Sequence, residues 1–207
     1  GIVFSLSNVV IQSSINSFGS VVIAGNSAAS NVEGFVYIAM NAIHQTAQTF
    51  TGQNAGAREY KRIVKILFIC LGIVTVVGTL FGNLVYLFSE QLLGLYSDSP
   101  EVIEAGRVRL LYICTIYALC GIMEIFVGVL RGMGYATMPM IVSVMGACVF
   151  RLVWIATIFK AHHKAEVLYI SYGVSWTLTI MVYVILTVIL FRRQNKLWKS
   201  MENVVKV

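Results

Sequence analysis

The 207-residue chain is 58% hydrophobic and 12% charged, about half the charged fraction of an ordinary soluble domain. This composition excludes an ordinary soluble domain and indicates an integral membrane protein. The net charge of +6 does not indicate a nucleic-acid partner, because most of the basic residues fall in a few short connections and the tail.

Six apolar stretches are long enough to cross a bilayer, since a helical span needs roughly 20 apolar residues. Backbone polar groups in lipid must be satisfied within their own segment, so these stretches are predicted to be helices, and they are too long for the strands of a β-barrel. We therefore predict an all-α, polytopic membrane protein. Its expected spans cover residues 2–24, 33–52, 63–88, 108–130, 138–159 and 167–191, followed by a basic tail over residues 192–207.

The connections between the predicted spans alternate in charge. Ten of the 15 Lys and Arg residues fall in the second connection, the fourth connection and the tail, whereas four fall in the third and fifth connections. Because positively charged loops stay in the cytoplasm, both termini of this segment are expected there, with the chain embedded in the plasma or inner membrane. The lipid bilayer is thus an expected partner.

The first two predicted spans each carry polar side chains along one helical face. These residues are Asn8, Gln12 and Asn16 in the first span, and Asn41, Gln45 and Gln48 in the second, with His44 beside them. Amides in hydrocarbon are costly unless they are paired or hydrated. For any single one of these residues, a hydrogen bond to a neighbouring helix is as good an explanation as a water-filled cavity. The two stripes together favour a shared water-filled cavity, in which these residues line a substrate path.

Two charged residues lie deep within predicted spans, where charges are candidate functional sites. A rise of 1.5 Å per residue places Glu124 about 10 Å, and Arg151 roughly 21 Å, from the cytoplasmic end. Glu124 is the candidate residue for ion or proton coupling; the alternative is a protonated carboxyl with a structural hydrogen bond. Arg151 is a candidate charge partner for Glu124, or a side chain that snorkels to the outer interface.

An aromatic face in the last predicted span includes Tyr172 and Trp176. Such a face attracts a lipophilic cation, which makes both residues substrate-path candidates, although packing is the more common role. The four cysteines form no C-x-x-C pair and are expected to be packing residues. Because no catalytic, metal-ligand or nucleotide motif is present, we expect no enzyme activity, no metal site and no bound cofactor.

Two motifs at predicted helix ends carry a resemblance to a known family. The first is Gly52-Gln53-Asn54-Ala55-Gly56-Ala57, followed by Arg58, Lys61 and Arg62; the second is Leu130-Arg131-Gly132-Met133-Gly134, with Pro139 opening the next span. With six spans and cytoplasmic termini, the chain resembles the C-terminal half of a multidrug and toxic compound extrusion (MATE) family transporter over essentially its whole length. It departs from the family where Tyr135-Ala136-Thr137 follow the second motif, and where the first span lacks a carboxylate.

The resemblance implies one lobe, helices seven to twelve, of a two-lobe, twelve-helix exporter with a central cleft. Such a transporter exchanges Na⁺ or H⁺ for small organic, often cationic, compounds. A missing N-terminal lobe of the same protein is then an expected partner, which would explain why Gly1 leads directly into apolar sequence. One alternative is a flippase for lipid-linked precursors, which would need a more cationic cavity. Another is a non-transporting scaffold or a self-associating half.

Overall fold

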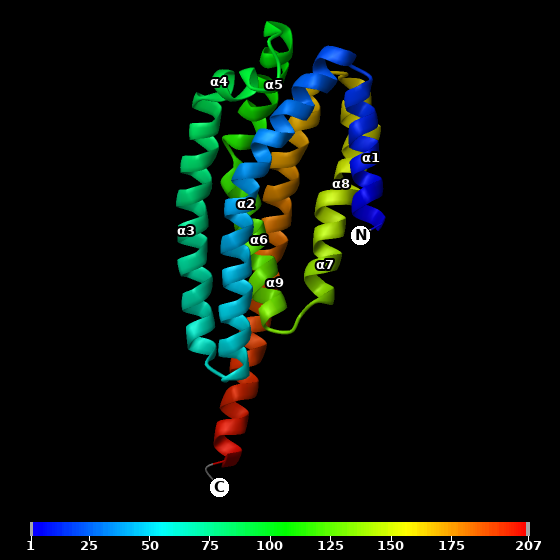
Figure 1. Ribbon diagram of the computed structural model, residues 1–207. Coiled ribbons are helices and arrows are strands. Elements are labelled where there is room, and N and C mark those ends of the chain that lie inside the picture. The colour runs from blue at the N-terminus through cyan, green and yellow to red at the C-terminus, as the bar shows by residue number, and fades with distance from the viewer. Residues whose placement is uncertain (1, 206–207) are drawn as a thin grey trace.

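A computed structural model describes the backbone of residues 2–205 and the side chains of residues 9–194 (Figure 1). The described residues form helices and no strand, which confirms the all-α prediction. The α-helices are α1 (Ile2–Asn16), α2 (Ser20–Gly56), α3 (Tyr60–Leu87), α4 (Ser89–Gly94), α5 (Pro100–Cys114), α6 (Tyr117–Gly132), α7 (Thr137–Ser143), α8 (Phe150–Trp154) and α9 (Ala165–Val205). The π-helical segments η1 (Val144–Val149) and η2 (Ile155–Phe159) continue α7 and α8 into one rod.

The six predicted spans correspond to α1, α2, α3, the α5–α6 pair, the rod over residues 137–159, and α9. Three single helices of the described part are long and apolar enough to cross a membrane: Tyr60–Leu87, Thr137–Phe159 and Ala165–Gln194. The pair α5 and α6 meets the same requirement as one broken span, bent by 46°. Neither α1 nor α2 meets the requirement. α1 has only 15 residues, and Ser, Asn and Gln side chains lower the mean hydropathy of α2.

The core of the bundle surrounds α6, which packs against α2, α3 and α9. Every residue from 125 to 130 is buried, so this part of α6 has no face outside the protein. Glycines on α6 bring the backbone of α2 close. A Cβ on Gly128 would lie 2.9 Å from the carbonyl oxygen of His44, and one on Gly132 would lie 2.6 Å from that of Gln48. Small residues at such contacts allow the close backbone approach that drives helix association in lipid.

The prediction of a loop between residues 25 and 32 was wrong. α1 ends at Asn16, the chain turns at Gly19 with a φ of 91°, and α2 then runs unbroken to Gly56. Residues 25–32 are rich in small and polar side chains, which resemble a loop in sequence. They form helix here because α5 packs on them: a Cβ on Gly25 would lie 2.6 Å from the carbonyl oxygen of Val102. Glu33 consequently lies well inside α2 and not at the start of a span.

The predicted span over residues 108–130 is not continuous. α5 begins at Pro100 and ends at Cys114, and α6 begins at Tyr117 in a different direction. The hydroxyl of Thr115 donates a hydrogen bond to the carbonyl of Leu111 at the break, and such back-bonding to residue i−4 bends helices. At the other end of the chain, α9 continues as a helix through the predicted tail to Val205.

Three basic connections lie at one end of the bundle. The α2–α3 turn, the α6–α7 connection and the last turns of α9 all lie at the lower end in Figure 1. Among the described side chains, these segments carry Arg58, Lys61 and Arg62, then Arg131, then Arg192 and Arg193. The α1–α2 turn, the α4–α5 connection and the start of α9 lie at the opposite end. The fold thus separates the basic connections from the others in space.

Candidate functional site

The candidate coupling residue Glu124 lies against His44, which joins α6 to α2. The Nδ1 atom of His44 is 2.7 Å from the backbone carbonyl oxygen of Glu124 and 3.4 Å from its carboxylate Oε2. A carbonyl oxygen only accepts hydrogen bonds, so Nδ1 carries a proton and donates it. The side chain of His44 is 5% exposed and that of Glu124 is 26% exposed. The carboxylate is therefore reachable by a small ion, whereas the imidazole beneath it is not.

The predicted charge pair between Glu124 and Arg151 is not formed. Among the described side chains, the ion-pair partner of Glu124 is His44. The guanidinium carbon of Arg151 lies instead 3.9 Å from the centre of the Tyr172 ring. The helical rise predicts that Glu124 and Arg151 differ in depth by about 10 Å, which agrees with the absence of a direct contact between them. The Nε atom of Arg151 is fully buried; snorkelling of its guanidinium toward the outer interface stays a prediction.

The amide stripes are largely open to the surroundings of the lobe. On α1, Gln12 and Asn16 are exposed and bonded to each other, with 3.0 Å between Nε2 and Oδ1. On α2, Gln45 is exposed, and Asn41 and Gln48 are half-buried. The side chain of Asn8 lies outside the described residues. The stripes do not pack on each other, because α1 lies beside η1 and α8, away from the lower half of α2 (Figure 1).

The aromatic face of α9 is part of the core. Trp176 is 4% exposed and packs edge to face against two tyrosines, with ring centres 5.8 Å from Tyr117 and 5.9 Å from Tyr172. Tyr172 is half-buried between the ring of Trp176 and the guanidinium of Arg151. The two predicted residues are thus brought together, in a packed arrangement. A role in the substrate path stays a prediction.

A buried ion pair near the other end of the bundle was missed by sequence reasoning. Arg109 of α5 is 6% exposed and places Nη2 2.7 Å, and Nε 3.2 Å, from Oε2 of Glu33 on α2. Its Nη1 donates to Oδ1 of Asn26 at 2.7 Å, and Tyr169 of α9 donates to the same oxygen at 3.4 Å. This cluster joins α2, α5 and α9. The available signal was the spacing of Asn26 and Glu33, seven residues apart and so on one helical face.

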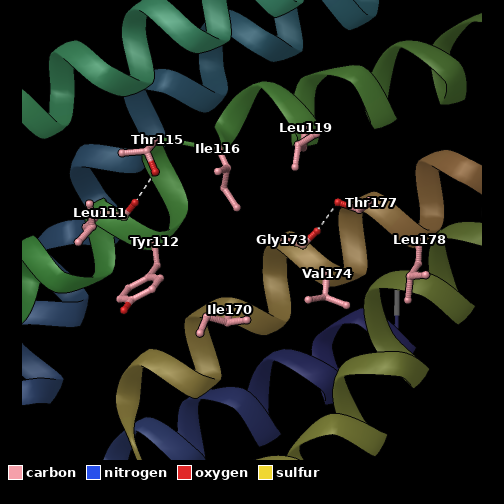
Figure 2. A pocket seen from close by; sticks show the side chains of 10 residues that line it. All are labelled: Leu111, Tyr112, Thr115, Ile116, Leu119, Ile170, Gly173, Val174, Thr177 and Leu178. Atoms are coloured by element: carbon pink, nitrogen blue, oxygen red, sulfur yellow. Dashed lines mark hydrogen bonds between the residues drawn. The ribbon is translucent and has the colours of Figure 1, made fainter.

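An apolar cavity of about 700 Å³ lies between the α5–α6 bend and α9. Figure 2 shows its lining side chains: Leu111, Tyr112, Thr115, Ile116, Leu119, Ile170, Gly173, Val174, Thr177 and Leu178. The two threonine hydroxyls donate to carbonyls of their own helices, those of Leu111 and Gly173, and so offer little to a ligand. Helical spacing places the α9 residues of this cavity on the face opposite Tyr172 and Trp176. The cavity thus offers an apolar surface separate from the charged residues.

Comparisons with known proteins agree on one family. The family model described as MatE matches residues 1–157. "Probable multidrug resistance protein YoeA" of Bacillus subtilis is 22% identical over 188 residues, which cover 87% of this chain and 39% of that protein. "Probable multidrug resistance protein NorM" of Aromatoleum aromaticum is 27% identical over 123 residues, or 59% of this chain and 27% of the relative.

The fold is similar to that of a solved transporter. The crystal structure of the Vibrio cholerae MATE transporter VcmN in the bent form matches with a TM-score of 0.82 and 20% sequence identity. The match covers 94% of this chain and 44% of VcmN. The chain therefore spans about two fifths of the length of YoeA and of VcmN.

Proposed function

Because this chain belongs to the MatE family of transporters, we propose that it forms the C-terminal lobe of a secondary antiporter that exports small organic compounds. The whole transporter contains a second, N-terminal lobe, and the two lobes enclose the cleft through which the compound moves. The multidrug descriptions of YoeA and NorM support export of several compounds over transport of a lipid-linked precursor.

The observation that carries the proposal is the contact between His44 and Glu124. It links the helix that bears the exposed amides to the central helix of the lobe, through a carboxylate that stays partly accessible. A Na⁺ ion or a proton at this carboxylate weakens its attraction for the Nδ1–H group of His44. A ligand shifts a conformational equilibrium only by its different affinity for the two states. Ion binding that loosens α2 from α6 would supply that difference.

The basic connections support one orientation of the transporter in the membrane. The α2–α3 turn, the α6–α7 connection and the end of α9 share one end of the bundle and carry most of the basic side chains. Under the positive-inside rule, this end faces the cytoplasm of the cell membrane. The Glu33–Arg109 cluster then lies toward the outer side, and Glu124 toward the cytoplasmic side.

Replacing Glu124 with Gln in the full-length transporter is expected to lower gradient-driven dye efflux by about tenfold or more. A factor of this size corresponds to a typical coupling free energy between two sites. The variant keeps the shape of the side chain but loses the charge that an ion or proton neutralises. Efflux of a cationic dye is measured in proteoliposomes under a Na⁺ gradient and, separately, a pH gradient. The gradient that no longer accelerates efflux identifies the coupling ion.

Glu104→Gln is the matched control, since this carboxylate is exposed and, among the side chains that the structure describes, pairs with its helical neighbour Arg107. It should leave efflux unchanged. Unchanged coupling in Glu124→Gln would remove Glu124 from the mechanism. Failure of the wild-type protein to move any dye under either gradient would overturn the proposed function.

A further inference from the structure

Arg151 is a cation in the middle of a membrane-spanning rod, and it lacks an acidic partner. It lies on α8, the short segment between the two π-helical segments. No ion pair among the described side chains, residues 9–194, includes it. Its Nε atom is fully buried and has no hydrogen-bond partner, although the residue as a whole is half-buried. A charge in this position is costly unless something neutralises it.

Two acidic side chains inside the bundle, Glu33 and Glu124, are already engaged. Glu33 receives two hydrogen bonds from Arg109, and Glu124 faces His44. Arg109 lies over the same tyrosine as Arg151, with its guanidinium carbon 6.0 Å from the centre of the Tyr172 ring. The Glu33–Arg109 pair is neutral, so Arg151 leaves an uncompensated positive charge beside Tyr172.

The position of Arg151 over Tyr172 fixes the orientation of its guanidinium. With its carbon 3.9 Å from the ring centre, the group is held by cation–π attraction to the ring face. Tyr172 is itself held by Trp176, which is buried. A guanidinium held by its face keeps its edge free, and that edge carries a fork of N–H donors suited to a carboxylate or phosphate. The neighbouring π-helical segments are a second sign of function, since such segments are frequent at functional sites.

We propose that Arg151, oriented by Tyr172, binds a carboxylate or phosphate group of the transported compound. This inference rests on the proposed transport function and specifies its substrate class: an organic compound that bears an anionic group, whether or not it also carries a positive charge. The anion supplies the missing partner of Arg151, and its departure restores the unpaired state. The same chemistry is offered by a soluble solute and by the headgroup of an anionic lipid.

The test compares two fluorescent dyes that share a xanthene ring. Carboxyfluorescein carries free carboxylates, whereas rhodamine 6G is a cation with an ester in place of the free carboxylate. Both are titrated onto the full-length transporter in phosphatidylcholine nanodiscs. Arg151→Gln is expected to weaken carboxyfluorescein binding by about tenfold or more, the loss expected for a charge-assisted hydrogen bond, with rhodamine 6G binding changed less than about twofold.

Two further variants show whether the effect belongs to the site. Lys160→Gln removes a positive charge from the exposed end of the same rod and should change neither affinity. Arg151→Lys keeps the charge but loses the planar fork, so its loss of carboxyfluorescein affinity should be intermediate. Arg151→Lys also replaces Arg151→Gln as the test variant if Arg151→Gln does not give a monodisperse size-exclusion profile.

Nanodiscs that contain phosphatidylglycerol distinguish the two sources of the anion. If phosphatidylglycerol competes with carboxyfluorescein in the wild type, and competes less in Arg151→Lys, the site belongs to a lipid headgroup. If it does not compete, the site belongs to a soluble solute. Equal losses for both dyes in the Arg151 variants, or no loss for carboxyfluorescein, would overturn the proposal. Efflux of rhodamine 6G is measured in parallel, because its retention in a variant that no longer binds the anion leaves the transport function standing.

Discussion

Replacing Arg109 with Met will destabilise the full-length transporter by about 3–5 kcal/mol, the cost of removing one partner from a buried ion pair. The side chains of Arg109 and Glu33 are 8% and 14% exposed, and Arg109 also satisfies Asn26. Without the guanidinium, the Glu33 carboxylate keeps neither its charge partner nor its hydrogen bonds. The measurement is the midpoint of thermal unfolding in detergent, followed by size-exclusion chromatography.

A double variant separates the lost pair from the lost volume. Arg109→Met combined with Glu33→Gln should recover a large part of the loss, because no buried charge remains. The surface pair Arg107–Glu104 is the control, with side chains that are 38% and 66% exposed. Arg107→Met should cost less than about 1 kcal/mol, as exposed pairs do. A loss at Arg109 as small as that at Arg107 would contradict a structural role for the buried pair.

Replacing Gly82 with Ala will destabilise the lobe by about 1–3 kcal/mol, the usual cost of overpacking a filled interior. Gly82 is buried on α3, where a Cβ would overlap the backbone carbonyl of Cys114 at the end of α5. Because that obstacle is backbone, it cannot move aside by changing rotamer. The α5–α6 bend would have to shift, which also changes the cavity beside it. Unfolding midpoints of the two proteins measure the effect.

Gly72 provides the comparison on the same helix. No atom lies within 4 Å of a Cβ built on Gly72. Gly72→Ala should therefore stabilise the helix by about 0.5–1 kcal/mol, since alanine loses less conformational entropy than glycine. If both substitutions shifted the midpoint in the same direction and by the same amount, the close contact between α3 and α5 would be refuted.

The fold was predictable where one simple pattern covered a whole helix. α3 and α9 are long and almost uniformly apolar over their spans, so composition and length were sufficient. Helix breaks were harder to predict. At the α5–α6 break, the hydroxyl of Thr115 forms a hydrogen bond with a carbonyl of its own helix. The polar stretch after Gly25, in contrast, is helical because α5 packs against it.

The candidate site was predicted in part. Glu124 could be selected because a carboxylate within an apolar span is unusual. Its contact with His44 joins residues 80 positions apart, and helical periodicity carries no information on such pairs. Arg109 was counted with the third connection, although it stands at the start of the predicted span over residues 108–130, because Arg107 and several acidic residues precede it. Its burial depends on Glu33, which stands at the start of the predicted span over residues 33–52.

We expect the amide stripes of α1 and α2 to face water inside the full-length transporter, and thiol accessibility tests this most directly. Single cysteines replace Gln12, Gln45 and Gln48, and Phe68, which is 67% exposed on the outer helix α3, serves as the lipid-facing control. The native cysteines are buried, which keeps the background low. With a charged, membrane-impermeant maleimide, we expect labelling at the three amide positions and none at Phe68→Cys. If Gln45→Cys and Gln48→Cys were as unreactive as Phe68→Cys, the stripe would not border an aqueous cleft.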